Sequence, residues 1–208
     1  MIPIETAGMF VVASVALALA PGPDNIFVLA QSAMSGRIAG VIVTLGLCTG
    51  LIFHTLAVAF GVAVVFQTSA VAFTVLKLVG AAYLLYLAWM AFRAAPGASG
   101  DADPVKLSTR ELYVRGLVMN VANPKVAIFF MAFLPQFAEP ANGSVPAQIA
   151  VLGALFMACA LAVFSAIAWA AGNLGAWFQQ SERAPVVLNR IAGTVFVALA
   201  LRLAVADR

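Results

Sequence analysis

The chain has 208 residues, of which 64% are hydrophobic and only 9% are charged, and its mean hydropathy is +1.06. These values exclude a soluble domain with a polar surface. The net charge of +3 comes from basic residues scattered along the chain, so the sequence holds no basic patch of the kind that binds nucleic acid. We therefore expect an all-α integral membrane protein that lies in a lipid bilayer.

Apolar stretches separated by turn residues predict six transmembrane helices, over residues 6–34, 39–66, 70–93, 109–136, 146–177 and 186–206. A span needs about 20 apolar residues, so these helices fill the chain as a single membrane domain, 1–208. Ser108 followed by Glu111 has the capping-box pattern that starts a helix. The polar segment 94–108 before it divides the domain into a first repeat, 1–93, and a second repeat, 109–208.

The first and fourth of these helices are interrupted. Pro21, Gly22 and Pro23 break the first, because proline lacks a backbone donor and glycine tolerates torsions that end a helix. Asn123 and Pro124 break the fourth in the same way. Three helices on each side of the linker give halves of opposite orientation, so we expect inverted repeats whose breaks meet near the middle of the membrane, as in secondary transporters. Chance placement of two prolines is the alternative, since proline is common in membrane helices.

Charged and amide side chains flank both breaks. Asp24 and Asn25 follow the first, whereas Asn123 and Lys125 flank the second. A charge at the centre of a membrane helix costs about 2.5–3.5 kcal/mol on insertion scales, so Asp24 and Lys125 need partners. They either pair with each other or bind a ligand that bears both charges. An α-amino acid is such a ligand: its ammonium suits Asp24, and its carboxylate suits Lys125 and the N–H groups of residues 125–126. We expect the N–H groups of residues 24–26, at the other restarted helix, to lack intrahelical partners as well.

Other polar residues within the predicted spans have two interpretations each. Asn25, Gln31 and Ser32 either line a path along the first helix or form interhelical hydrogen bonds. Gly46 and Gly50, four residues apart, indicate close helix packing and imply no chemistry.

His54 is the only histidine and lies near the middle of the second predicted span. The chain contains no phosphate-binding loop, so uphill transport would need an ion gradient, and Asp24 and His54 are the candidates for proton coupling. A lone histidine can also serve only as a hydrogen-bonding partner of a neighbouring helix.

A membrane thiol–disulfide electron carrier is the alternative function. Cys48 and Cys159 occupy corresponding helices of the two halves and could face each other. Buried cysteine is more often a small apolar residue, and nothing nearby in the sequence would lower the pKa of either thiol. One histidine and two distant cysteines make a poor metal-ligand set, and no hydrolase motif is present. We therefore expect neither an enzyme nor a cofactor or metal.

The distribution of basic residues predicts the orientation. Seven Lys or Arg residues lie at the connections between helices one and two, three and four, and five and six. Lys77, Arg202 and Arg208 lie on the opposite side, which includes both termini. The positive-inside rule then places the three connections in the cytoplasm and both termini outside.

The sequence resembles the lysine exporter and homoserine/threonine exporter (LysE/RhtB) family. The resemblance rests on three motifs: residues 21–25 (PGPDN), residues 77–87 (KxxGxxYLxYL), and residues 116–137, in which GxxxNxxNPK is followed by FF and LPQF. It implies a six-helix inner-membrane amino-acid exporter driven by the proton gradient, in which Asp24, Asn120, Asn123 and Lys125 line the translocation site. No second acid points to a basic substrate, so we favour small neutral amino acids such as threonine or homoserine. Whether the chain forms a homo-oligomer stays open.

Overall fold

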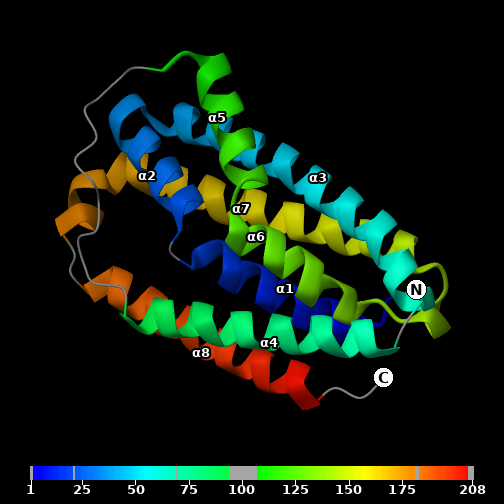
Figure 1. Ribbon diagram of the computed structural model, residues 1–208. Helices are drawn as coiled ribbons and strands as arrows, with labels where there is room; N and C mark the ends of the chain where they lie inside the picture. The colour runs from blue at the N-terminus through cyan, green and yellow to red at the C-terminus, as the bar shows by residue number, and fades with distance from the viewer. Residues whose placement is uncertain (1, 21, 69, 94–106, 181–182, 206–208) are drawn as a thin grey trace.

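A computed structural model describes residues 2–20, 22–68, 70–93, 107–180 and 183–205, and every regular element within these ranges is helical (Figure 1). The elements in chain order are α1 Ile4–Leu19, α2 Pro23–Ser35, α3 Arg37–Thr68, α4 Ala70–Arg93, α5 Thr109–Val121, α6 Pro124–Ile128, the π-helix η1 Phe129–Phe133, the 3₁₀ turns η2 Leu134–Phe137 and η3 Pro140–Asn142, α7 Val145–Gln180 and α8 Arg183–Val205. The predicted ranges 39–66, 70–93 and 146–177 lie within α3, α4 and α7, and 109–136 runs from α5 to η2. The described residues of the ranges 6–34 and 186–206 lie in the α1/α2 pair and in α8. Pro21 and most of the predicted linker 94–108 lie outside the described residues.

The two predicted interruptions are present. The first break separates α1 from α2, where Gly22 is the N-cap and Pro23 the first helical residue. The second break separates α5 from α6, where Asn123 is the N-cap and Pro124 the first helical residue. The two segments bend by 49° across the second break and by more than 40° across the first. Proline at the first helical position is favourable because the N–H that it lacks would have had no partner there.

Two single helices in the described residues are long and apolar enough to cross a membrane, Arg37–Gly61 within α3 and Val145–Ala171 within α7. The α1/α2 pair and the pair formed by Thr109–Val121 and Pro124–Phe137 each have the length and composition of one further, broken span. The chain is therefore a multi-pass helical membrane protein.

Helix α3 is the centre of the packing and contacts α2, α5 and α7, while α4 lies against α8 on the other side of the molecule (Figure 1). The Gly46 and Gly50 pair faces α5: a Cβ at Gly46 would collide with the backbone carbonyl of Tyr113, and one at Gly50 would meet the side chain of Asn120. The predicted close approach of helices at these glycines is confirmed. It brings α3 against the residues that precede the second break.

Aromatic side chains fill the core beyond the second break. The rings of Phe129 and Phe133 lie 4.8 Å apart between centroids, and Phe130 meets Phe156 of α7 edge to face at 5.0 Å. The π-helix η1, which the sequence did not predict, carries three of these rings. The capping box at the start of α5 is confirmed, because Ser108 and Glu111 exchange both of its hydrogen bonds.

Candidate functional site

The residues of the two breaks meet at one buried place. Asp24 of α2, Asn120 of α5, Asn123 of the second break and Lys125 of α6 are 2%, 1%, 3% and 9% exposed. Polar groups buried to this extent must find hydrogen-bond partners or lose free energy. The hydrogen-bond partners of each of these side chains determine which polar atoms are left to bind a ligand.

The ammonium group of Lys125 is hydrogen-bonded to the C-terminal end of α1. Its Nζ donates hydrogen bonds to the carbonyl oxygens of Leu17, at 3.2 Å, and Ala20, at 2.9 Å. These carbonyls belong to the last turn of α1, which the first break leaves without intrahelical donors. The C-terminal end of a helix also carries a partial negative charge, so the ammonium group is stabilised there without a direct ion pair.

Asp24 lies in the first turn of α2, at the positive end of that helix. Its Oδ2 accepts a hydrogen bond of 3.2 Å from the side-chain amide of Asn120. Its Oδ1 is buried without a partner. Among the described residues no direct ion pair joins Asp24 to Lys125, so the first of the two predicted alternatives, a paired acid and base, is not what the structure contains.

The remaining amides tie the breaks together. Asn25 donates to the carbonyl of Ala18 at the end of α1, and Asn123 Oδ1 accepts from the N–H of Lys125 at 3.0 Å. Two of the N–H groups that we expected to be free are therefore bonded. The N–H of Lys125 is capped by Asn123, and that of Ile26 donates to the carbonyl of Gly22 at 3.1 Å, because an N-cap carbonyl accepts the first intrahelical bond.

Several buried polar atoms at the site have no partner in the structure. They are Asp24 Oδ1, Asn25 Oδ1, Gln31 Oε1, Asn120 Oδ1 and Asn123 Nδ2. An unpaired buried polar atom costs about 1–3 kcal/mol, so a group of them in one region calls for an explanation such as a ligand. Four of the five belong to residues at the breaks.

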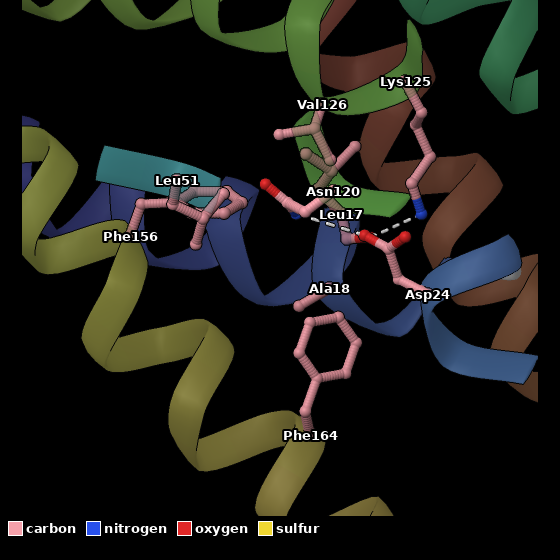
Figure 2. A pocket seen from close by; sticks show the side chains of 9 residues that line it. All are labelled: Leu17, Ala18, Asp24, Leu51, Asn120, Lys125, Val126, Phe156 and Phe164. Atoms are coloured by element: carbon pink, nitrogen blue, oxygen red, sulfur yellow. Dashed lines mark hydrogen bonds between the residues drawn. The ribbon is translucent and has the colours of Figure 1, made fainter. Parts of the chain in front are cut away.

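A small cavity opens between these residues (Figure 2). Asp24, Asn120 and Lys125 supply its polar wall, and the rest of its lining is apolar. About 10 Å³ of it admits a water-sized sphere, which is roughly the room that one water molecule needs. An amino acid is larger, so its entry requires the helices around the cavity to move apart.

Gln31 and Ser32 lie further along α2 and are both buried. The Ser32 hydroxyl donates to the carbonyl of Val28 at 2.6 Å, within its own helix, and Gly40 of α3 leaves room for it. Ser32 thus supports the packing of α2 against α3. Gln31 has a buried side-chain oxygen, Oε1, without a hydrogen-bond partner. The predicted interhelical hydrogen bond is not present at Ser32, because its hydroxyl bonds within α2.

His54 of α3 lies beside the second break. Its Nε2 is 3.1 Å from the backbone carbonyl oxygen of Asn120. Because a carbonyl only accepts, Nε2 carries the proton and donates it. The imidazole also lies against the ring of Phe130, with centroids 5.7 Å apart. His54 is therefore one residue removed from Asp24, with Asn120 between them.

The two cysteines are free thiols on the adjacent helices α3 and α7. Cys48 Sγ lies 4.0 Å from the carbonyl oxygen of Met157 on α7, and its hydrogen-bonding partner is this carbonyl and not the Cys159 thiol. Neither thiol lines the cavity. Nothing in this arrangement supports the electron-carrier alternative. In the part of the chain that is described, no group of three or more His, Cys, Asp or Glu side chains is placed to hold a metal ion.

Sequence reasoning missed two parts of the site. The carbonyls of Leu17 and Ala20 could have been found, because any break in a helix leaves carbonyls free at the end of the preceding segment. Phe156 and Phe164, which line the cavity from α7, could not have been singled out. They lie in a helix so uniformly apolar that its periodicity does not mark an inner face.

The fold and the site define a multi-pass membrane protein in which two broken helices place a carboxylate and an ammonium group beside one small cavity. The family model described as "LysE type translocator" matches residues 15–207. The chain belongs to the LysE-type translocator family, as the sequence motifs indicated.

Relatives align over nearly the whole chain. A homoserine/homoserine lactone efflux protein of Salmonella typhimurium is 31% identical over 195 residues, which cover 94% of each chain. Uncharacterised membrane proteins of Pseudomonas aeruginosa and Escherichia coli are 29% and 31% identical, over 95% of this chain and over 94% and 86% of their own lengths. No solved structure matches the chain.

Proposed function

We propose that this protein exports a small neutral amino acid across the inner membrane, and that the cavity between the two breaks is its binding site. The observation that carries the proposal is the state of the two charges. Asp24 and Lys125 line the same cavity without pairing, and each is stabilised by a helix end. Membership of a translocator family and likeness to a homoserine efflux protein support this reading.

The unpaired atoms match the two ends of an α-amino acid. Asp24 Oδ1 and Asn120 Oδ1 are acceptors for the substrate ammonium group. The Lys125 ammonium group has three protons and gives two to carbonyls, so a third is left for the substrate carboxylate. Asn123, whose Nδ2 is also unpaired, caps α6 and does not line the cavity. Bound in this way, a zwitterion would give partners to Asp24 Oδ1, Asn120 Oδ1 and the third proton of Lys125.

The proposed transport cycle follows from the fold that we infer. Six spans in two inverted repeats, with the linker 94–108 in the cytoplasm and both termini outside, place one break in each half. The cavity is too small for an amino acid, and we therefore infer that an alternating-access cycle opens it to each side of the membrane in turn. Inward movement of a proton on Asp24 or His54 would drive export, since the chain has no nucleotide-binding motif.

A growth-inhibition screen tests the proposal. Cells with and without the protein are grown on dipeptides of each amino acid, which raise the internal pool of that amino acid. We expect protection against the dipeptides of one or a few neutral amino acids, and no protection by the Asp24→Asn variant at equal membrane abundance. Equal sensitivity of both strains to every dipeptide, with the protein present in the membrane, would contradict export of amino acids.

A further inference from the structure

The cavity is divided into a polar and an apolar half. Figure 2 shows Lys125 and Asp24 on one side and Leu51 and Phe156 on the other, with Asn120 between them. The apolar lining consists of Leu17, Ala18, Leu51, Val126, Phe156 and Phe164. A substrate whose charged end is held by Asp24 and Lys125 therefore directs its side chain towards aliphatic and aromatic carbon.

The polar side chains that line the cavity are all engaged by the charged end of the substrate. Asp24 Oδ1 and Asn120 Oδ1 take the ammonium group, and the third proton of Lys125 takes the carboxylate. Among the nine residues that line the cavity, only Asp24, Asn120 and Lys125 have polar side chains. A hydroxyl group on the substrate side chain would be buried without a partner, at a cost in binding.

We propose that the preferred substrates are amino acids with small apolar side chains, such as valine or norvaline, over their hydroxyl-bearing isosteres threonine and homoserine. This inference rests on the proposed function and narrows its substrate class. It departs from the substrates that the sequence favoured, because the sequence showed only that no second acid is present and could not show the apolar wall.

Two aromatic rings limit the size of that side chain. Phe156 is held from behind by Phe129 and Phe130 of the π-helix, with ring centroids 5.5 and 5.0 Å away, so its position is fixed by the packing of η1. Phe164 lies about two turns further along α7 and is also buried. Removing the Phe164 ring would lengthen the apolar half of the cavity and admit larger side chains.

Counterflow in proteoliposomes tests the inference. Uptake of each labelled amino acid is driven by an excess of the same unlabelled amino acid trapped inside, so the result depends neither on the orientation of the protein nor on proton coupling. Valine is compared with threonine, and norvaline with homoserine, since each pair differs by a methyl and a hydroxyl group of similar size. We expect the apolar member to have a roughly 10- to 100-fold lower half-saturating concentration.

The possible outcomes distinguish a failure of the substrate preference from a failure of the proposed export function. Counterflow of threonine or homoserine at a concentration equal to or below that of its apolar isostere would overturn the inference and leave the exporter intact. A preference of less than about fivefold for the apolar member would overturn it as well. Counterflow of none of the twenty amino acids would remove the proposed function itself.

Substitution of Phe164 in the apolar lining of the cavity provides a second test of the substrate preference. Phe164→Ala should shift the preference from valine towards leucine and phenylalanine by at least about fivefold, and Phe164→Leu should give an intermediate shift. Phe60→Ala is the matched control, because this ring on α3 is 74% exposed and lies outside the cavity lining. Because the readout is a ratio between substrates, it does not depend on how much protein folds. An unchanged ratio in Phe164→Ala would remove Phe164 from the substrate pocket.

Discussion

The two breaks are built from similar sequences but are stabilised in different ways. The second break is capped by its own residues: Asn123 caps α6, and the N–H of Ala122 bonds back to the carbonyls of Val118 and Asn120. The first break has no side-chain cap of its own at Gly22. Its free carbonyls at the end of α1 are instead bonded by Lys125 from the second break and by Asn25.

This difference explains why a buried acid and a buried base lie near each other without pairing. Lys125 is held at the negative end of α1 and Asp24 at the positive end of α2, so each charge has a helix terminus as its partner. Asn120, one turn before the second break, then links the carboxylate to α5. Lys125 therefore holds the end of α1 in place, which Asp24 does not do. Substitutions at the two positions can separate this structural role from substrate binding.

Lys125→Met should have the largest effect. It removes both hydrogen bonds to the end of α1 and the cation proposed to bind the substrate carboxylate. We expect counterflow to fall at least about 100-fold, since truncating a buried, hydrogen-bonded charge typically costs 2–5 kcal/mol. We also expect the free energy of unfolding to fall by roughly 3 kcal/mol, because carbonyls of Leu17 and Ala20 lose their donor. Thermal unfolding in detergent measures this second effect.

Asp24→Asn should abolish transport to a similar degree while changing stability much less. An asparagine at this position still offers an oxygen to the Asn120 amide, so we expect a loss of about 1 kcal/mol or less in the free energy of unfolding. Glu5→Gln, which neutralises an exposed acid in the first turn of α1, is the control and should alter neither property. Equal destabilisation by Asp24→Asn and Lys125→Met would show that the two charges support the fold as a pair, against the asymmetry described above.

The positions of the breaks could be predicted from the sequence because Pro23 and Pro124 act locally on the helix that contains them. Which residues meet at the breaks followed largely from charge, since Asp24 and Lys125 cannot remain in an apolar interior without partners. The particular partners could not be predicted. Whether an ammonium group bonds a carboxylate or two carbonyls depends on how α1 and α6 approach each other, and that is decided by packing over many residues.

The π-helix and the apolar wall were beyond prediction for a related reason. Residues Phe129–Phe133 have no proline or glycine to mark a change of helix type, and the rings of Phe129 and Phe130 pack against Phe156 of α7. The role of the α3 glycines could be predicted only in part. Their spacing indicated close packing, but that Gly50 faces Asn120 required the structure.

Gly50→Ala should have an intermediate effect on the second break alone. A Cβ at this position would lie 2.6 Å from Asn120 Oδ1 and 2.8 Å from its Cβ, so Asn120 would be pushed away from its position beside Asp24. Overpacking of this kind costs about 1–3 kcal/mol, and we expect counterflow to fall roughly tenfold. Gly61→Ala on the same helix is the matched control, since nothing lies within 4 Å of the added methyl group. If both variants transport equally, the position of Asn120 is not needed for transport.

The smallest expected effect is that of His54→Gln. This variant tests whether His54, beside the second break, carries the coupled proton. His54 donates from Nε2 to the carbonyl of Asn120, and a glutamine amide can replace that donor. Asp24, by contrast, lines the cavity and has an unpaired oxygen within it. We therefore expect Asp24 to carry the proton and His54 to position Asn120. Export from vesicles with an acidic exterior should slow less than about threefold in His54→Gln, and its acceleration by the gradient and its collapse with a protonophore should persist. Loss of the gradient dependence in this variant, with counterflow intact, would instead assign the proton to His54. Export that ignores the protonophore in the unaltered protein would exclude proton coupling through either break.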